Sequence, residues 1–279
     1  MSGRVEGQVA FITGAARGQG RSHAVRLAEE GADVIAFDFC GDAPTTSYTM
    51  ATKADLDETA DLVRGLGRMC VSVVGDVRVQ SDLDAAVQRG LVELGRIDIA
   101  VANAGIVSWN EVHQISEDQW DDMIATNLTG AWKTIKAVTP TMIAQGSGSI
   151  VVISSGAGLS GPNNLAHYAS AKHGLVGLTK VSSNELSPQG IRVNSVHPTQ
   201  VDTPMIMHEG MFRLFRPELD APGRDDIVVV SKRLHTIPIP WVDSRDVSNA
   251  VLFLASDEAR YITGVQLPVD AGGIVKSVY

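Results

Sequence analysis

The chain has 279 residues, 44% of them hydrophobic and 20% charged, which is an ordinary globular composition with enough length for one large α/β domain. Its net charge of −9, without any basic run, argues against nucleic acid or an anionic membrane as a partner. No run approaches about 18 apolar residues, and no His, Cys and Asp side chains have the spacing of a metal site, so we expect neither a membrane-spanning helix nor a catalytic metal.

Short apolar runs alternate with amphipathic stretches along most of the chain. In chain order we predict a strand at 8–13, a helix at 21–31, a strand at 32–39, a helix at 52–67, a strand at 69–77, a helix at 81–95, a strand at 97–105, a helix at 116–145, a strand at 149–155, a helix at 164–186, a strand at 191–198, a helix at 244–256 and a strand at 264–270. Thr52 with Asp55, and Ser116 with Gln119, predict capped helix starts. The alternation indicates a parallel sheet with helices on both faces.

Two segments interrupt this alternation: an insertion at 39–53, and residues 203–243, which are rich in Met, Phe, Pro and charged side chains. Segments this long are usually lids, binding loops or disordered stretches. We find no repeat and no linker, so we treat residues 1–279 as a single domain. The first strand follows the start directly, which leaves no room for a signal peptide, and Cys40 and Cys70 are expected as free thiols in a reducing, cytoplasmic setting.

A glycine-rich turn, TGAARGQG at 13–20, joins the first predicted strand to the first helix. Gly14, Gly18 and Gly20 permit a tight turn whose backbone N–H groups approach a pyrophosphate, and the helix N-terminus adds a positive dipole end. The turn alone is a weak signal, but its place between a strand and a helix favours a dinucleotide site over a plain turn with spare glycines.

Asp38 ends the second predicted strand. A carboxylate there can accept both hydroxyls of an adenosine ribose and repels a 2′-phosphate, which favours NAD over NADP. Arg17 in the turn could favour a phosphate, but Asp38 occupies the position that the extra phosphate would take. A solvated acid at a strand end is the alternative interpretation.

Tyr168 and Lys172 are separated by only Ala and Ser residues in the predicted helix 164–186. Residues i and i+4 share one helix face, so the phenol and the ammonium are expected to project together. A neighbouring cation favours the phenolate and is expected to lower the pKa of the tyrosine, as a general base near neutral pH requires. An isolated pair of this kind is more often a coincidence on the surface, so the assignment depends on the other motifs.

Together, TGAARGQG, Asp38, NAG at 103–105, Asn127 in TNLTG, Ser155 in VVISSGAG and YASAK at 168–172 resemble the short-chain dehydrogenase/reductase family over nearly the whole chain. The spacing from Ser155 to Tyr168 also matches the usual spacing of that family. The resemblance implies a Rossmann-type, doubly wound parallel sheet of seven strands with helices on both faces, in a single dinucleotide-binding oxidoreductase domain that usually forms a homotetramer.

The resemblance also implies roles for residues. Tyr168 would be the general base, Lys172 would lower its pKa and hold the nicotinamide ribose, and Ser155 would donate to the substrate oxygen. Asn127 would mark a helix distortion whose backbone holds a water connected to Lys172. The expected NAD contacts are Gly14, Arg17, Gly18, Gln19, Gly20, Asp38, Phe39, Asp76, Val77, Asn103, Ala104, Gly105, Tyr168, Lys172, Pro198, Val201 and Thr203. Thr199 stands where the family usually has Gly, so an altered backbone is expected there.

The insertion, with ANAG, HPTQVDTPM and MFRLFRPEL, is similar to the mycofactocin-associated branch of the family, which includes carveol dehydrogenases. Members of that branch are thought to keep NAD bound and to pass electrons to mycofactocin, a peptide-derived redox carrier. In the insertion, Cys40, Tyr48 and Met50 offer apolar cover over the adenine. A surface loop or an oligomer contact is the alternative.

Substrate specificity is expected to come from residues 203–243. The residues assigned to it are Trp109, Leu159, Met205, Met211, Phe215 and Trp241, whose character predicts a small apolar secondary alcohol such as a cyclic terpenoid. Packing at a subunit interface is the alternative. We therefore interpret the chain as an NAD-dependent alcohol dehydrogenase. A 3-ketoacyl reductase is disfavoured by Asp38 and the acidic charge, and a non-catalytic redox sensor by the complete set of catalytic residues. His167 and His197 receive no role.

Overall fold

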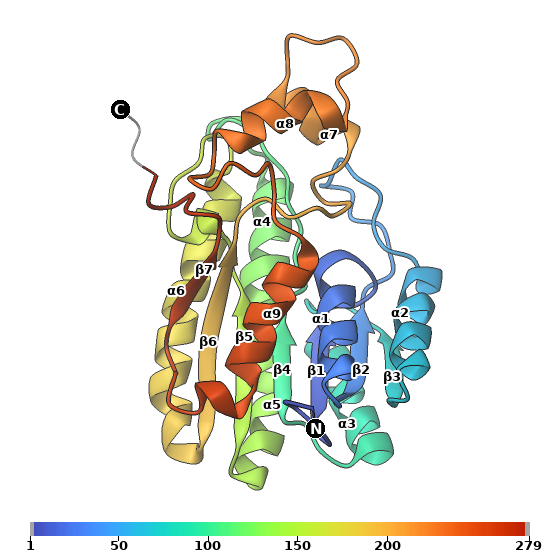
Figure 1. Ribbon diagram of the computed structural model, residues 1–279. Coiled ribbons are helices and arrows are strands. Elements are labelled where there is room, and N and C mark those ends of the chain that lie inside the picture. Colours follow the sequence, from blue (N-terminus) through green and yellow to red (C-terminus); the bar gives the residue numbers. More distant parts are fainter. Residues whose placement is uncertain (1–2, 277–279) are drawn as a thin grey trace.

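The computed structural model describes residues 3–276 and contains a seven-stranded, entirely parallel sheet in the order β3-β2-β1-β4-β5-β6-β7. The strands are β1 (Val9–Thr13), β2 (Asp33–Asp38), β3 (Cys70–Val74), β4 (Ile99–Ala102), β5 (Gly148–Ile153), β6 (Ile191–Pro198) and β7 (Gln266–Val269). Helices cover both faces of this sheet, so the predicted Rossmann-type α/β fold is confirmed (Figure 1).

Alternate strand residues pack against different groups of helices. Ala10 and Ile12 belong to a core shared with α1 (Gly18–Glu29), α2 (Lys53–Gly65) and α9 (Ser244–Ala255). Val9 and Phe11 belong to a second core with α3 (Gln80–Leu94), α5 (Gly130–Gln145) and α6 (Ala166–Leu186). Burying one large side chain, such as Ile12 or Phe11, contributes about 1.5–3 kcal/mol, so the two cores hold the sheet between its helix layers.

The predicted helical region at 116–145 contains the distortion that the family resemblance implies at Asn127. It consists of α4 (Glu117–Ile124), a π-helical turn η1 (Ala125–Thr129) and α5. A π-turn changes the backbone hydrogen-bond pattern locally, and such turns occur often at functional sites. Hydrophobic periodicity does not reveal it because the apolar positions continue through the turn. Both predicted capping boxes are present, at Thr52 and at Ser116.

The two segments that interrupt the alternation differ in structure. Residues 39–52 contain neither helix nor strand, whereas the 203–243 segment contains two short helices, α7 (Glu209–Phe215) and α8 (Arg224–Lys232). Both segments lie beyond the carboxyl ends of the strands (Figure 1). Ligands of open α/β sheets bind at this end, at the place where the strand order reverses, which here is between β1 and β4.

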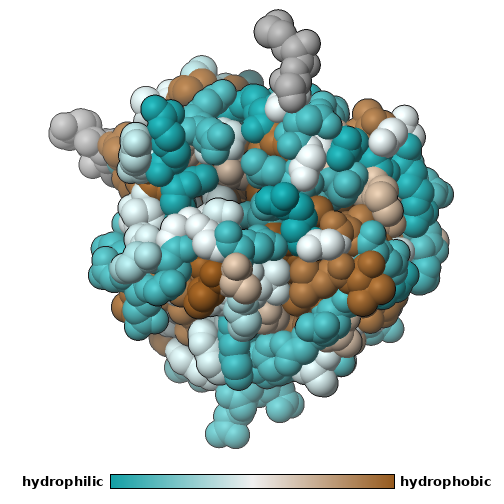
Figure 2. Space-filling model, turned by 90° about the horizontal axis from the view of Figure 1, so that it is seen from below, coloured by the Kyte–Doolittle hydropathy of each residue, from teal (hydrophilic) through white to brown (hydrophobic). Residues whose placement is uncertain are grey.

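The opposite end of the molecule, where the strands begin, shows mostly hydrophilic residues with apolar residues in patches (Figure 2).

Cys40 and Cys70 are free, as predicted. Among residues 3–276, no helix combines the length and the apolar character that crossing a bilayer requires.

Candidate active site

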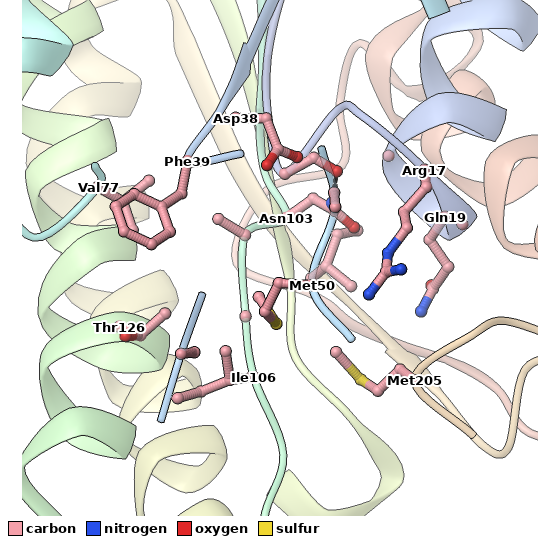
Figure 3. A pocket seen from close by; sticks show the side chains of 18 of the residues that line it. Arg17, Gln19, Asp38, Phe39, Met50, Val77, Asn103, Ile106, Thr126 and Met205 are labelled. Atoms are coloured by element: carbon pink, nitrogen blue, oxygen red, sulfur yellow. Dashed lines mark hydrogen bonds between the residues drawn. The ribbon is translucent and has the colours of Figure 1, made fainter. Parts of the chain in front are cut away.

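A cavity lies at the carboxyl ends of β1, β2, β4 and β5, and most of the predicted cofactor residues line it. They are Gly14, Arg17, Gly18, Gln19, Gly20, Asp38, Phe39, Asp76, Val77, Asn103, Ala104, Gly105, Tyr168, Lys172 and Thr203. Pro198 and Val201 are buried and are not part of the lining. Figure 3 shows Phe39 and Val77 together on one side of the cavity, and Arg17 and Gln19 on another, with Met50 between them.

The turn after β1 has the shape that a phosphate-binding turn requires. Gly14 and Gly18 have positive φ angles of 67° and 56°, which L side chains rarely adopt. A Cβ on Gly20 would lie 1.9 Å from the Gly14 carbonyl oxygen, so the start of α1 could not pack so closely with any other residue. The free N–H groups at the start of α1 therefore border the cavity, and the residues present fit a pyrophosphate.

Asp38 is buried at the end of β2, and its carboxylate is tied to the turn. One oxygen accepts a hydrogen bond from the Ala16 N–H at 2.9 Å, and the other accepts one from the Cys40 N–H at 3.1 Å. The carboxylate still lines the cavity with capacity to accept further hydrogen bonds, as a ribose partner must. The Arg17 guanidinium donates to the Thr49 carbonyl of the insertion, so it is already engaged in the protein.

The insertion closes over the cavity through hydrogen bonds to three other segments. Besides the bond from Arg17, the Thr45 hydroxyl donates to Asp122 of α4 at 2.5 Å, and the Tyr48 hydroxyl accepts from the Val107 N–H at 3.2 Å. Side chains of the insertion, including Tyr48 and Met50, line the cavity beneath.

Apolar cover over the adenine by Cys40, Tyr48 and Met50 of the insertion stays a prediction. Cys40 packs against the hydrophobic core, whereas Tyr48 and Met50 both line the cavity, with Met50 in its middle (Figure 3).

Tyr168 and Lys172 lie on one face of α6, as their spacing predicts, with the Lys172 Nζ atom 5.6 Å from the centre of the Tyr168 ring. The expected lowering of the tyrosine pKa by Lys172 is not found. Burial raises the pKa of Tyr168, and a side-chain hydrogen bond with Ser155 opposes that effect. Burial lowers the pKa of Lys172 to about 8, and its Nζ donates to the Ile153 carbonyl at 2.9 Å. Desolvation therefore sets the direction of both shifts, in a site where Lys172 is buried and Tyr168 is partly buried.

Ser155 lies two residues after the end of β5, and a residue without a predicted role supports it. The buried His197 donates from Nδ1 to the Ser155 carbonyl at 2.9 Å, so its Nε2, 2.9 Å from the Ser195 hydroxyl, is the acceptor. Burial lowers the pKa of His197, which keeps this neutral form. The available signal was a polar ring near the carboxyl end of a predicted strand, but Arg192, Asn194 and Ser195 of the same strand are polar too, which makes that signal weak.

Asn127 lies within η1 and is 1% exposed. Its side-chain oxygen accepts from the Ile106 N–H at 2.8 Å, and its side-chain nitrogen donates to the Ile106 carbonyl at 2.8 Å. The side chain therefore holds the residue after Gly105 in place, and only the backbone is free for the role that the family resemblance implies. The predicted helix distortion at this residue is present.

Thr199 is accommodated without backbone strain. Within residues 3–276, the non-glycine residues with positive φ are Cys40, Asn164 and Ala271. The Thr199 hydroxyl donates to His235 Nε2 at 2.7 Å, and His235 Nδ1 donates to the Ile239 carbonyl at 2.7 Å. Threonine therefore adds a connection between β6 and the 203–243 segment.

Of the six predicted substrate residues, Met205 lines the cavity and the other five do not. Met211 is buried in α7, and the Trp241 ring packs under the Arg224 guanidinium at 4.8 Å. Phe215 ends α7, and Leu159 follows a short 3₁₀ turn. Trp109 stacks on His208 with ring centres 5.8 Å apart. Composition could not separate residues that face a ligand from those that hold the segment together.

We expect the stability difference between the wild type and Lys172→Met to depend on pH. The native pKa of about 8 lies below the ordinary value of 10.5, so between these pH values only the unfolded wild type carries the proton. We compare the unfolding free energy of the wild type with that of the variant at each pH. The wild type is therefore least stable relative to the variant below pH 8, and its relative stability rises by roughly 3 kcal/mol as the pH increases to about 10.5.

Denaturant unfolding at a series of pH values tests this prediction. Lys180→Met, at an exposed position of the same helix, serves as the control and is expected to parallel the wild type. If unfolding free energy depended on pH in the same way in the wild type and in Lys172→Met, the pKa of Lys172 would not be lowered in the folded protein.

The sequence model for short chain dehydrogenases matches residues 8–212. A putative short-chain type dehydrogenase/reductase of Mycolicibacterium smegmatis is 55% identical over 279 residues, covering 99% of this chain and 100% of that protein. The (-)-trans-carveol dehydrogenase of Rhodococcus erythropolis is 53% identical over 275 residues, covering 98% and 99% respectively. Among solved structures, carveol dehydrogenase from Mycobacterium avium in complex with NAD has a TM-score of 0.97 and 55% identity, covering 98% of this chain and 100% of that one.

Proposed function

The chain belongs to the short-chain dehydrogenase family and is an NAD-dependent oxidoreductase of alcohols, and from this premise we propose that it interconverts a small, apolar, cyclic secondary alcohol and its ketone. The observation that carries the proposal is the joining, in one cavity, of the phosphate-binding turn, Asp38, and the Tyr168–Lys172 pair. The similarity to carveol dehydrogenases supports a terpenoid-like alcohol.

The roles of this chain's residues follow from their contacts. Tyr168 removes the hydroxyl proton of the alcohol, and Ser155, which hydrogen-bonds Tyr168, orients the substrate oxygen. Lys172 lies beside the phenol and holds the nicotinamide ribose, while Asp38 holds the adenosine ribose. Bound NAD supplies the acceptor for the hydride at its nicotinamide ring. Because burial raises the pKa of Tyr168, alcohol oxidation is expected to increase with pH across the neutral range.

We further propose that NAD stays bound through turnover and that an external carrier of the mycofactocin type reoxidises it. The three hydrogen-bonded connections of the insertion support slow cofactor release, because all must open before the cavity does.

A homotetramer is proposed as well, supported by exposed apolar side chains on α5 and α6, among them Trp132, Ile143 and Val181. The two free cysteines support a cytoplasmic location.

The proposal is tested on extensively dialysed protein, which is denatured so that the released NAD and NADH can be assayed. Intact protein is then offered carveol with and without added NAD. We expect near-stoichiometric NAD, and one turnover followed by a stall until an electron acceptor is added. A variant lacking residues 41–51 is expected to exchange NAD faster.

Other outcomes would contradict particular parts of the proposal. Empty protein with steady turnover on added NAD would contradict retention, and absence of any carveol oxidation would contradict the substrate class. A deletion variant that exchanges NAD no faster than the wild type would show that the insertion does not retain the cofactor.

A further inference from the structure

Three aromatic side chains from distant parts of the chain pack together next to the cavity. Tyr48 comes from the insertion, Trp109 from the loop after β4, and His208 from the position directly before α7. The centre of the His208 ring lies 5.2 Å from that of Tyr48 and 5.8 Å from that of Trp109. We refer to these three residues as the aromatic cluster.

The aromatic cluster is fastened to the catalytic end of the cavity. Tyr48 accepts a hydrogen bond from the Val107 N–H, and the neighbouring Ser108 hydroxyl bonds His167 Nε2 at 2.8 Å. His167 directly precedes Tyr168 in α6, so the loop that carries Trp109 connects the insertion to the helix of the general base. Tyr48 and Tyr168 both line the cavity.

The chemistry of the aromatic cluster suits an apolar ring. Tyr48 is 9% exposed, and burial raises its pKa to about 12, so the phenol is neutral. Burial also lowers the pKa of His208, against an opposing effect of the Met205 backbone, so the imidazole is a neutral ring at neutral pH. The Tyr48 and His208 ring planes are tilted by 39° and those of Trp109 and His208 by 30°, and such packed neutral rings offer aromatic surface to which cyclic molecules bind favourably.

We propose that Tyr48 is a specificity-determining residue of the alcohol site, and that its ring, supported by His208 and Trp109, is the wall against which a cyclic substrate packs. This inference rests on the proposed function and deepens it, because the insertion then recognises the substrate as well as covering the cofactor. A cyclic alcohol contacts the wall extensively, whereas a short acyclic alcohol that reaches Tyr168 does not.

The test compares carveol with propan-2-ol in Tyr48→Ala, Tyr48→Phe and Thr49→Ala, by following NADH formation in the first turnover of NAD-loaded protein. In Tyr48→Ala, the second-order rate constant of NADH formation with carveol, divided by that with propan-2-ol, is expected to fall about 10-fold, as loss of an aromatic contact implies. Tyr48→Phe keeps the ring and is expected to stay within about threefold of the wild-type ratio. Thr49→Ala alters an exposed neighbour in the same insertion and is expected to leave the ratio unchanged.

An unchanged ratio in Tyr48→Ala would overturn the inference, and so would an equal loss of activity on both alcohols, which indicates general damage. Calorimetric titration of the same proteins with carveol separates this inference from the proposed function. If the wild type binds carveol without oxidising it, the proposed function fails, and weaker carveol binding by Tyr48→Ala alone still supports the wall. If the wild type neither binds nor oxidises carveol, both are overturned.

Discussion

Replacing Tyr168 by Phe is expected to lower alcohol oxidation at least about 100-fold, the range that general acid–base catalysis contributes. The substitution keeps the ring packed in α6 and removes only the hydroxyl, which alone can take the proton of the alcohol in the proposed mechanism. The Ser155 hydroxyl then loses the phenol but still accepts from the Ala157 N–H, and the Ser155 carbonyl still accepts from His197, so the site keeps its shape. The measurement is the rate of NADH formation in the first turnover with carveol.

Tyr261→Phe is the matched control, because Tyr261 is 89% exposed and lies outside the cavity. This variant is expected to react at the wild-type rate. The NAD content of each protein is assayed in parallel, so that a loss of cofactor is not mistaken for a loss of the base. If Tyr168→Phe, with its NAD still bound, oxidised carveol as fast as the wild type, the assignment of the general base would be wrong.

Replacing Asp38 by Ser is expected to weaken NAD binding about 10-fold to 100-fold, because hydrogen bonds to a charged acceptor contribute roughly 1.5–3 kcal/mol. The same substitution removes the negative charge that disfavours a 2′-phosphate, so the preference is expected to move toward NADP. Titration of cofactor-free protein with NAD and with NADP measures both effects. Since Asp38 also accepts from the Ala16 and Cys40 N–H groups, part of the loss reflects a less ordered turn.

Two further variants separate charge from shape. Asp38→Asn retains an oxygen acceptor for the turn and removes the charge, and is expected to shift the NADP-to-NAD preference with less loss of order. Asp61→Ser changes the net charge equally at an exposed position of α2 and is expected to behave like the wild type. If the preference of Asp38→Ser equalled that of Asp61→Ser, Asp38 would not select the cofactor.

The helix distortion at Asn127 could be predicted from the sequence, but the contacts of its side chain could not. Low helix propensity and the family resemblance both pointed to a distortion there, and η1 is present. The two hydrogen bonds between its side chain and Ile106 could not be foreseen, because they join residues that are adjacent only after η1 packs against the loop that follows β4. The same holds for His197, whose position under Ser155 depends on the pairing of β5 with β6.

The direction of the pKa shift of Tyr168 is a second property that the sequence could not predict. Helical spacing correctly placed Lys172 beside the phenol, but the sign of the shift depends on how much water the fold removes around both groups. Burial is a property of the whole packed structure and cannot be derived from the separation of two residues along a helix. Amino-acid composition likewise indicated an apolar 203–243 segment, and only packing showed that Met205 faces the cavity while Trp241 lies under Arg224.

Local features of this protein follow from its amino acids directly. The glycine-rich turn, the two capping boxes, the seven apolar strands and the Tyr168–Lys172 spacing each depend on backbone geometry within a few residues, so the order of the motifs identifies the family and its parallel sheet. The meeting of Tyr48, Trp109 and His208 has another origin, because no short-range rule links three segments so far apart. Their contact, and the closure of the insertion over the cavity, arise only when the sheet brings the carboxyl ends of its strands to one edge.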